Sequence, residues 1–204
     1  MKLYYMPGAC SLATHIVLEW TGAKYETQKI THDQLKSPEY LKVNPMGAVP
    51  ALEVDGHILT QNAGALNYLA EAHPEARLRG DGTPLGVAEV ERWLGFVNSD
   101  VHPAYKPLFG STGYLEDEAM IEKSKVNARQ RLRQLFKILN DHMKGRDWIA
   151  GPTRSIADPY LYVMLRWAKA QKIDLSGLDD LERFFARVSA DEGVKKVLIA
   201  ESAN

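Results

Sequence analysis

The chain has 204 residues and a formal net charge of −1 at pH 7; 45% of its residues are hydrophobic and 25% are charged. This balance is typical of a soluble globular protein with one large domain or two small ones. The sequence shows no basic block, no membrane-length apolar run and no signal-peptide core. We therefore expect a cytoplasmic protein without a nucleic-acid or membrane partner.

The first predicted elements are a strand over residues 2–6 and a helix over residues 12–21, where Leu12 and Ile16 recur at helical spacing. The single cysteine of the chain, Cys10, lies in the loop between them. At such a junction the free N–H groups and the dipole of the helix favour a thiolate, which would make Cys10 reactive. Inert packing is the alternative, because free cysteines are often buried.

The cysteine count limits the redox chemistry of the chain. An internal disulfide is excluded, and Ala13 stands where a Cys-x-x-Cys motif would place a second thiol. Any redox role of Cys10 therefore requires a thiol from another molecule.

The next segments continue an α/β pattern. Gly22 is a good stop for the first helix, and a second strand over residues 25–30 is expected to pair in parallel with the first. Pro38 is expected to open a short helix as its first residue.

A hairpin and a helix follow. Asp55-Gly56 separates strand patterns over residues 49–54 and 57–60, which predicts a tight two-residue turn. The helix after it begins at Gln61-Asn62, and Asn62 is the expected N-cap. The resulting order βαβαββα predicts a thioredoxin-like sheet.

Beyond a polar, glycine-rich linker at residues 79–83 the pattern is entirely helical. The predicted helices cover residues 84–109, 116–143, 158–171 and 178–189. The segment Ser155-Ile156-Ala157-Asp158 predicts a capping box, in which Ser155 accepts from the Asp158 N–H and the Asp158 carboxylate accepts from the Ser155 N–H.

Four segments, in this order and spacing, together resemble the cytosolic glutathione transferases, and the first is most like the bacterial beta class. They are Lys-Leu-Tyr-Tyr-x-Pro-Gly-Ala-Cys-Ser at 2–11, Asn-Pro-x-Gly-x-Val-Pro-Ala-Leu at 44–52, Trp-Leu-x-Phe at 93–96 leading to His102, and Ser-Ile-Ala-Asp at 155–158. The resemblance spans the whole chain. It implies an α/β plus all-α fold: a thioredoxin-like glutathione-binding domain over residues 1–80, and a helical bundle domain over residues 84–204 that contributes the electrophile site.

The resemblance implies glutathione as co-substrate, without a metal, and places its binding in the first domain. Val49, before a cis bond to Pro50, would pair with the peptide groups of glutathione. Gln61 and Asn62 would receive the γ-glutamyl end at a helix N-terminus, and Lys36 would reach the glycyl carboxylate. Gln61 lacks the negative charge that relatives often place there for the ammonium group. On the residues alone, the alternatives are that Pro50 only starts a strand, that Asn62 only caps a helix and that Lys36 is a solvated surface lysine.

The resemblance also places Cys10, Ser11, Tyr5 and His102 around the glutathione sulfur. Cys10 would contact that sulfur and form a mixed disulfide with it, while Ser11 and Tyr5 would donate hydrogen bonds to a thiolate. His102 would keep Cys10 ionised or shuttle a proton, with a domain-interface histidine as the alternative. Gly95 stands where relatives often have asparagine, so a polar contact near the thiol is expected to be lost or replaced by water.

The expected activity is transfer of the glutathione thiolate to small, mostly apolar electrophiles, as in detoxification, by a two-fold homodimer. The aromatic residues expected at the electrophile site, between the domains, are Tyr5, His102, Tyr105, Phe109 and Tyr162; packing in the core is the alternative for them. Two other functions stay open: a glutathione-dependent thiol–disulfide oxidoreductase or peroxidase that uses Cys10, and a non-enzymatic glutathione- or ligand-binding protein.

Overall fold

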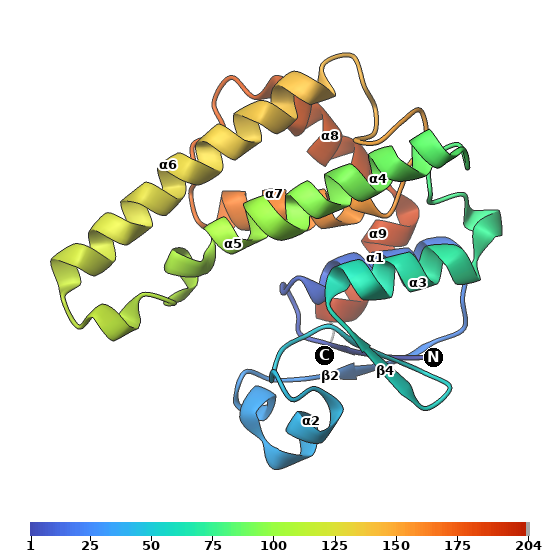
Figure 1. Ribbon diagram of the computed structural model, residues 1–204, viewed down its shortest axis with the longest axis horizontal. Helices are drawn as coiled ribbons and strands as arrows, with labels where there is room; N and C mark the ends of the chain where they lie inside the picture. The colour runs from blue at the N-terminus through green and yellow to red at the C-terminus, as the bar shows by residue number, and fades with distance from the viewer. Residues whose placement is uncertain (203–204) are drawn as a thin grey trace.

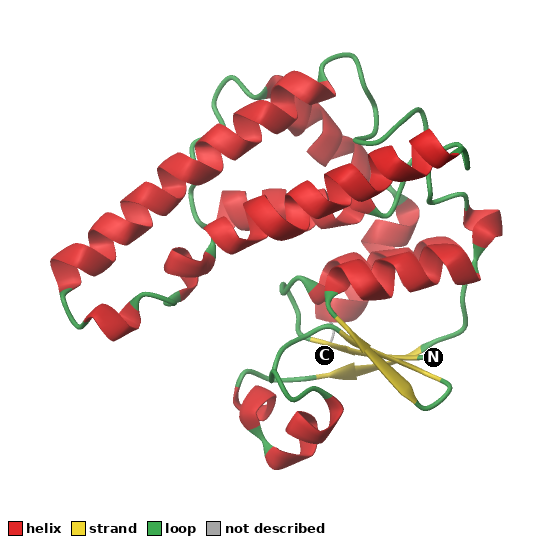
Figure 2. Ribbon diagram, in the orientation of Figure 1, coloured by secondary structure: helices red, strands yellow, loops and turns green. Residues whose placement is uncertain are grey.

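The computed structural model describes residues 1–202 and consists of a small mixed sheet with helices on both faces, followed by helices alone (Figure 1). Figure 2 shows that the strands are confined to one end of the molecule. The strands are β1 (Lys2–Tyr5), β2 (Glu26–Lys29), β3 (Ala51–Val54) and β4 (His57–Thr60). Their order in the sheet is β2-β1-β3-β4. The predicted thioredoxin-like sheet is therefore confirmed, with strand ends that differ by at most two residues.

The directions of the strands follow from two local connections. β1 and β2 are parallel, as a crossover helix between them requires, whereas β3 runs antiparallel to both β1 and β4. Asp55 and Gly56 both have positive φ, 48° and 81°, which a tight turn of this kind needs. The predicted hairpin is confirmed.

Three helices belong to the sheet: α1 (Ser11–Thr21), α2 (Pro38–Val43) and α3 (Asn62–Ala72). α1 and α3 lie on one face and α2 on the other (Figure 1). Side chains alternate across β1 accordingly. Tyr5 belongs to the main core, whereas Tyr4 packs with Tyr40 of α2 in a second, smaller cluster.

The second half contains six helices and several tighter turns among the described residues. The helices are α4 (Pro84–Phe96), α5 (His102–Ala104), α6 (Glu118–Met143), α7 (Ala157–Ala170), α8 (Asp179–Ala190) and α9 (Glu192–Ser202). Over residues 1–202, no helix combines the length and apolarity that crossing a bilayer demands.

Two helical predictions are wrong in detail. The helix expected over residues 84–109 is broken by a π-helical turn at Val97–Val101 and continues as α5 and a 3-10 turn at Lys106–Phe109. Pro103 and Pro107 lie in these last segments, and each lacks the N–H that a continuous helix would use. α9 was not expected; Asp191 caps it by accepting from the Val194 N–H, and the helix packs on α1.

The turn before α7 is built around a buried carboxylate. Asp158 accepts hydrogen bonds from the Ser155 N–H (2.7 Å), the Ser155 hydroxyl (2.8 Å) and the Ile149 N–H (2.9 Å). The expected bond from the Ser155 N–H is confirmed. The reciprocal bond differs, because the Asp158 N–H donates to the Ser155 carbonyl and the hydroxyl accepts from Ala157 instead.

Candidate active site

Cys10 occupies the N-cap position of α1, directly after the loop that leaves β1. The residue is partly buried, and its thiol donates a hydrogen bond to the carbonyl of Val49 at 3.3 Å. Val49 precedes Pro50, and the bond between them is cis, as expected. The loop before β3 therefore faces the start of α1 across the Cys10 side chain.

Two cavities meet at Cys10. The first, of about 290 Å³, is the more polar of the two, and its polar lining side chains include Gln61, Asn62, Asn98, His102, Lys106 and Tyr160. The second, of about 540 Å³, is bounded by the Met6–Ala9 loop, Leu35, Phe109 and Trp167. Val49 and Ala48 line both cavities. One thiol thus lies between a hydrogen-bonding compartment and a more apolar one.

The Cys10 thiol is protonated at neutral pH. Burial raises its pKa to about 11, and hydrogen bonding from Asn62 and from nearby backbone groups offsets only part of this effect. The expectation of a thiolate favoured by the helix N-terminus is therefore wrong, because the loss of solvation outweighs the helix dipole.

Ser11 holds the loop before Cys10 and is fully buried. Its hydroxyl accepts from the Met6 N–H at 3.2 Å and donates to the Met6 carbonyl at 3.3 Å. Because a hydroxyl has one proton, none is left for a ligand thiolate. The expected contact from Ser11 to the glutathione sulfur is therefore not available in this structure.

Tyr5 also lies away from the cavities. Its side chain is 1% exposed in the main core, and its ring centroid is 5.4 Å from that of His15 on α1. It lines neither cavity at Cys10. Tyr4 and Tyr5 face opposite sides of the sheet, and the main core takes up the Tyr5 ring. The expected contact of Tyr5 with the glutathione sulfur is therefore not made from this position.

Asn62 ties two helices together rather than capping one. α3 begins at Asn62, and Gln61 takes the N-cap position without a side-chain capping bond. The Asn62 amide donates to the Cys10 carbonyl at 3.0 Å and accepts from the Thr14 hydroxyl at 2.8 Å. The predicted cap is wrong, and in this structure the side-chain amide is occupied within the protein.

Gln61 and Lys36 lie at the edges of the site. Gln61 is exposed, lines the polar cavity and has φ 69°, which is unusual for a residue with a side chain. The Lys36 ammonium donates to the Met46 carbonyl at 3.2 Å. A Cβ on Gly47 would lie 2.5 Å from the Leu35 carbonyl oxygen, a backbone atom that cannot move aside, so only glycine fits at this position. Lys36 lines neither cavity and lies beside the Gly47 backbone.

His102 is joined to two residues that the sequence did not single out. Its Nδ1 is 2.6 Å from the Tyr160 hydroxyl, which in turn donates to Asn98 Oδ1 at 3.2 Å. Burial, with a smaller effect from the Lys106 charge, lowers the pKa of His102 to about 4. A neutral imidazole cannot keep Cys10 ionised, although it can still accept a proton.

Asn98 also changes the expectation about Gly95. Gly95 lies on α4 with no heavy atom within 4 Å of where a Cβ would stand. Asn98 follows three residues later, about one helical turn on, and lines the polar cavity. The side-chain amide of Asn98 therefore supplies, from the next helical turn, the polar group that Gly95 lacks.

Aromatic rings surround Trp167, another residue that sequence reasoning missed. The ring centroids of Phe109, His102 and Tyr105 lie 4.9, 5.0 and 5.4 Å from that of Trp167, all close to edge-on. Phe109 is 53% exposed and lines the larger cavity. Tyr162, expected here, instead stacks on Phe185 in the core.

The loop that carries Cys10 is held from the helical half. Trp167 Nε1 donates to the Gly8 carbonyl at 2.8 Å, and Glu201 of α9 accepts from the Gly8 N–H at 3.4 Å. Glu201 is itself fixed by His15, whose Nδ1 lies 2.9 Å from its carboxylate. The main-chain N–H and C=O of Gly8 therefore both have partners far along the chain.

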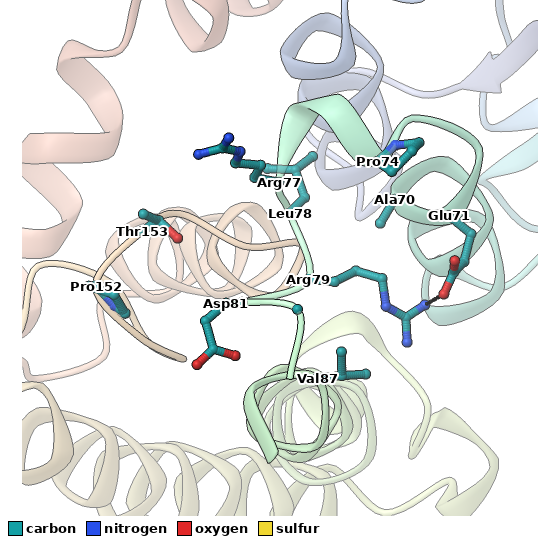
Figure 3. Close-up of a pocket in the computed structure, with 12 residues that line it drawn as sticks. Ala70, Glu71, Pro74, Arg77, Leu78, Arg79, Asp81, Val87, Pro152 and Thr153 are labelled. Atoms are coloured by element: carbon teal, nitrogen blue, oxygen red, sulfur yellow. Dashed lines mark ion pairs between the residues drawn. The ribbon is translucent and has the colours of Figure 1, made fainter. Parts of the chain in front are cut away.

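A separate hollow of about 510 Å³ lies at the linker between the halves (Figure 3). Arg79 extends across it to pair with Glu71, and it also pairs with Glu91. This hollow lacks the cysteine and histidine that meet in the other cavities. Among residues 1–202, no group of three histidine, cysteine or acidic side chains is arranged to hold a metal ion.

These features define a class: a thioredoxin-like sheet with a helical second half, in which a thiol and a cis-proline loop face a histidine from the helices. The chain belongs to the glutathione S-transferase family. Its residues 1–71 match the model of the glutathione S-transferase N-terminal domain, and residues 105–192 match that of the C-terminal domain.

Similar proteins agree with this assignment. The chain is 52% identical to glutathione S-transferase GST-4.5 of Xanthomonas campestris pv. campestris, over 100% of both sequences. It is 53% identical to a glutathione-S-transferase structure from Xylella fastidiosa, with a TM-score of 0.96 over 98% of each chain. A sphingomonad glutathione S-transferase complexed with glutathione is 35% identical, with a TM-score of 0.89 over 100% of each chain.

Proposed function

We propose that the protein is a glutathione S-transferase that conjugates the thiol of glutathione to small, mostly apolar electrophiles. The observation that carries this proposal is the meeting of a polar and a more apolar cavity at Cys10, with His102 beside it. Glutathione needs hydrogen-bond partners along its length, whereas an apolar electrophile needs desolvated surface. The polar cavity supplies the hydrogen-bond partners and the more apolar cavity supplies the desolvated surface, on either side of Cys10.

Glutathione is proposed to lie along the loop at Val49, where the main chain before Pro50 can pair with its peptide groups. Its γ-glutamyl carboxylate would lie at the N-terminus of α3, near Gln61 and the Asn62 N–H. Lys36, at the rim, would reach the glycyl carboxylate. The glutathione-bound sphingomonad relative supports this class of ligand.

The sulfur that reacts is proposed to be that of glutathione rather than that of Cys10. With a pKa near 11, only about one Cys10 thiol in 10,000 is ionised at pH 7. Thiol–disulfide exchange and peroxide reduction need this thiolate, so the raised pKa favours transfer over both. His102, neutral and at the cavity wall, is the proposed acceptor of the glutathione proton.

The electrophile is proposed to bind against Phe109 and Trp167, whose rings border the apolar compartment. In this arrangement the first domain, residues 1–80, binds glutathione, and residues 84–204 contribute the electrophile site. A two-fold homodimer, a cytoplasmic location and a role in detoxification complete the proposal; the free cysteine fits a reducing compartment.

The test combines retention on immobilised glutathione with conjugation of an aryl halide, for the protein and for Cys10→Ala. We expect retention and turnover in both, because Cys10 is not the attacking group. A Cys10→Ala variant that loses aryl-halide transfer would show that the Cys10 sulfur is required. Binding without turnover of any electrophile or disulfide would favour a ligand carrier.

A further inference from the structure

We infer that Tyr160 and Asn98 are positioning residues that keep the proton of neutral His102 on Nδ1, so that Nε2 is the atom that accepts the glutathione proton. The inference rests on the proposed transfer, since a thiol must bind beside His102 for the proton to be taken. It concerns a chain of three side chains that reaches the polar cavity from three helical segments: the Val97–Val101 turn, α5 and α7.

The direction of the chain follows from counting protons. Tyr160 is 1% exposed, and its hydroxyl has a single proton, which it donates to Asn98 Oδ1 at 3.2 Å. The hydroxyl oxygen therefore faces the His102 ring with a lone pair, at 2.6 Å from Nδ1. Two lone pairs cannot share such a distance, so Nδ1 carries the proton.

A neutral imidazole has one N–H, so a proton on Nδ1 leaves Nε2 as an acceptor. Within residues 1–202, Nε2 has no hydrogen-bond partner from the protein. His102 lines the cavity that Cys10 also lines, which leaves this lone pair available to a bound ligand.

The surroundings keep the imidazole neutral until a proton arrives. The ionisable groups that line the cavity with His102 are Cys10 from α1, Tyr160 from α7 and Lys106 from the 3-10 turn after α5. Burial and, to a smaller degree, the charge of Lys106 lower the pKa of His102. No carboxylate lines this cavity to favour an imidazolium beforehand.

The proposed step balances as follows. The S–H bond of glutathione breaks and its proton forms a bond with His102 Nε2, which gives an imidazolium and a thiolate. The thiolate forms a carbon–sulfur bond with the electrophile, and the leaving group departs with its electron pair. The Nε2 proton then passes to water. The Nδ1–H bond to Tyr160 persists throughout, which steadies the ring in both protonation states.

The experiment compares Tyr160→Phe, Asn98→Ala and Asn98→Asp with Tyr162→Phe as the matched control. Tyr162 lies on the same helix, and its hydroxyl is also hydrogen-bonded and buried, but it contacts Arg166 and Ser189 rather than His102. Nitrogen chemical shifts of the His102 ring in the ligand-free protein report which nitrogen carries the proton. The pH dependence of kcat/KM for glutathione with an aryl halide reports the base.

We expect Nδ1 to be protonated in the protein and in Tyr162→Phe. In Asn98→Ala the Tyr160 proton is released to turn toward Nδ1, so the ring proton should move to Nε2. Asn98→Asp keeps an acceptor for Tyr160 and should retain the Nδ1 proton, with a pH profile shifted upward by the added negative charge. For Asn98→Ala and Tyr160→Phe we expect kcat/KM to fall roughly tenfold or more, as loss of a correctly oriented base does.

A His102 that carries its proton on Nε2 in the unaltered protein would overturn the inference, and so would an Asn98→Ala variant that retains the Nδ1 proton. The nitrogen shifts need no substrate, so these outcomes do not depend on turnover. An unaltered protein with no transferase activity but a protonated Nδ1 would instead contradict the proposed function alone.

Discussion

Replacing Asp158 with alanine removes the carboxylate that closes the turn before α7. Asp158 is 0% exposed and accepts from two backbone N–H groups and one hydroxyl. The Ser155 hydroxyl can rotate to another acceptor, whereas the N–H groups of Ile149 and Ser155 cannot. A buried donor left unpaired costs about 1–3 kcal/mol, so the variant should lose about 2–6 kcal/mol from the free energy of unfolding.

The pH dependence gives a second, independent measure. Burial raises the pKa of Asp158 to about 6, above its ordinary value of 3.8. The folded state therefore binds this proton more tightly than the unfolded state. The stability that this proton adds is greatest below the ordinary pKa and is lost as pH rises through 6, whereas the hydrogen bonds that the carboxylate accepts remain. Between pH 4 and pH 7 the difference amounts to up to about 3 kcal/mol.

Urea unfolding at fixed protein concentration, at pH 5 and pH 7, measures both effects. Asp158→Asn is the matched control, because it keeps one acceptor oxygen and cannot ionise. It should lose less stability than Asp158→Ala, and its deficit relative to the unaltered protein should grow as pH falls. A loss below about 1 kcal/mol in Asp158→Ala, the lower limit for one unpaired donor, would refute this account of the turn.

Three further predictions concern the active-site loop. Cys10 should react with iodoacetamide at pH 7 far more slowly than a free cysteine, and the rate should rise up to about pH 11, where its thiol ionises; fast labelling at pH 7 would contradict the raised pKa. Trp167→Phe keeps an apolar ring but loses the donor to Gly8, so thermal unfolding should show a loss of about 1 kcal/mol, and an unchanged midpoint would speak against the contact. Glu201→Ala leaves buried His15 and the Gly8 N–H without their acceptor, and denaturation should show a loss of about 2–5 kcal/mol; a neutral effect would mean that water replaces the carboxylate.

Local patterns were sufficient for most of the fold. The β-rich content of residues 2–6 and the turn at Asp55-Gly56 predicted the sheet, because both signals depend on residues a few positions apart. α9 was missed since Gly193 weakens its helical pattern, while packing on α1 stabilises it.

The candidate site was predicted less completely, for a physical reason. Family likeness placed Cys10 and His102 correctly at one cavity. The hydroxyl of Ser11 and the amide of Asn62 were misjudged, because their partners are fixed only by the folded backbone. Tyr160 meets His102 from 58 positions away along the chain, a distance over which one sequence has no signal.

The two hydrogen bonds to the main chain of Gly8 have a consequence for exchanging the halves of this protein between relatives. Because Trp167 and Glu201 reach back to a loop near the N-terminus, exchanging the helical half for that of a distant relative would replace both partners at once. Such a chimaera would retain Cys10 but lose the fixed position of its loop. Recombination should therefore be tolerated only where the introduced helical half keeps a donor at position 167 and an acceptor at position 201 for the main chain of residue 8.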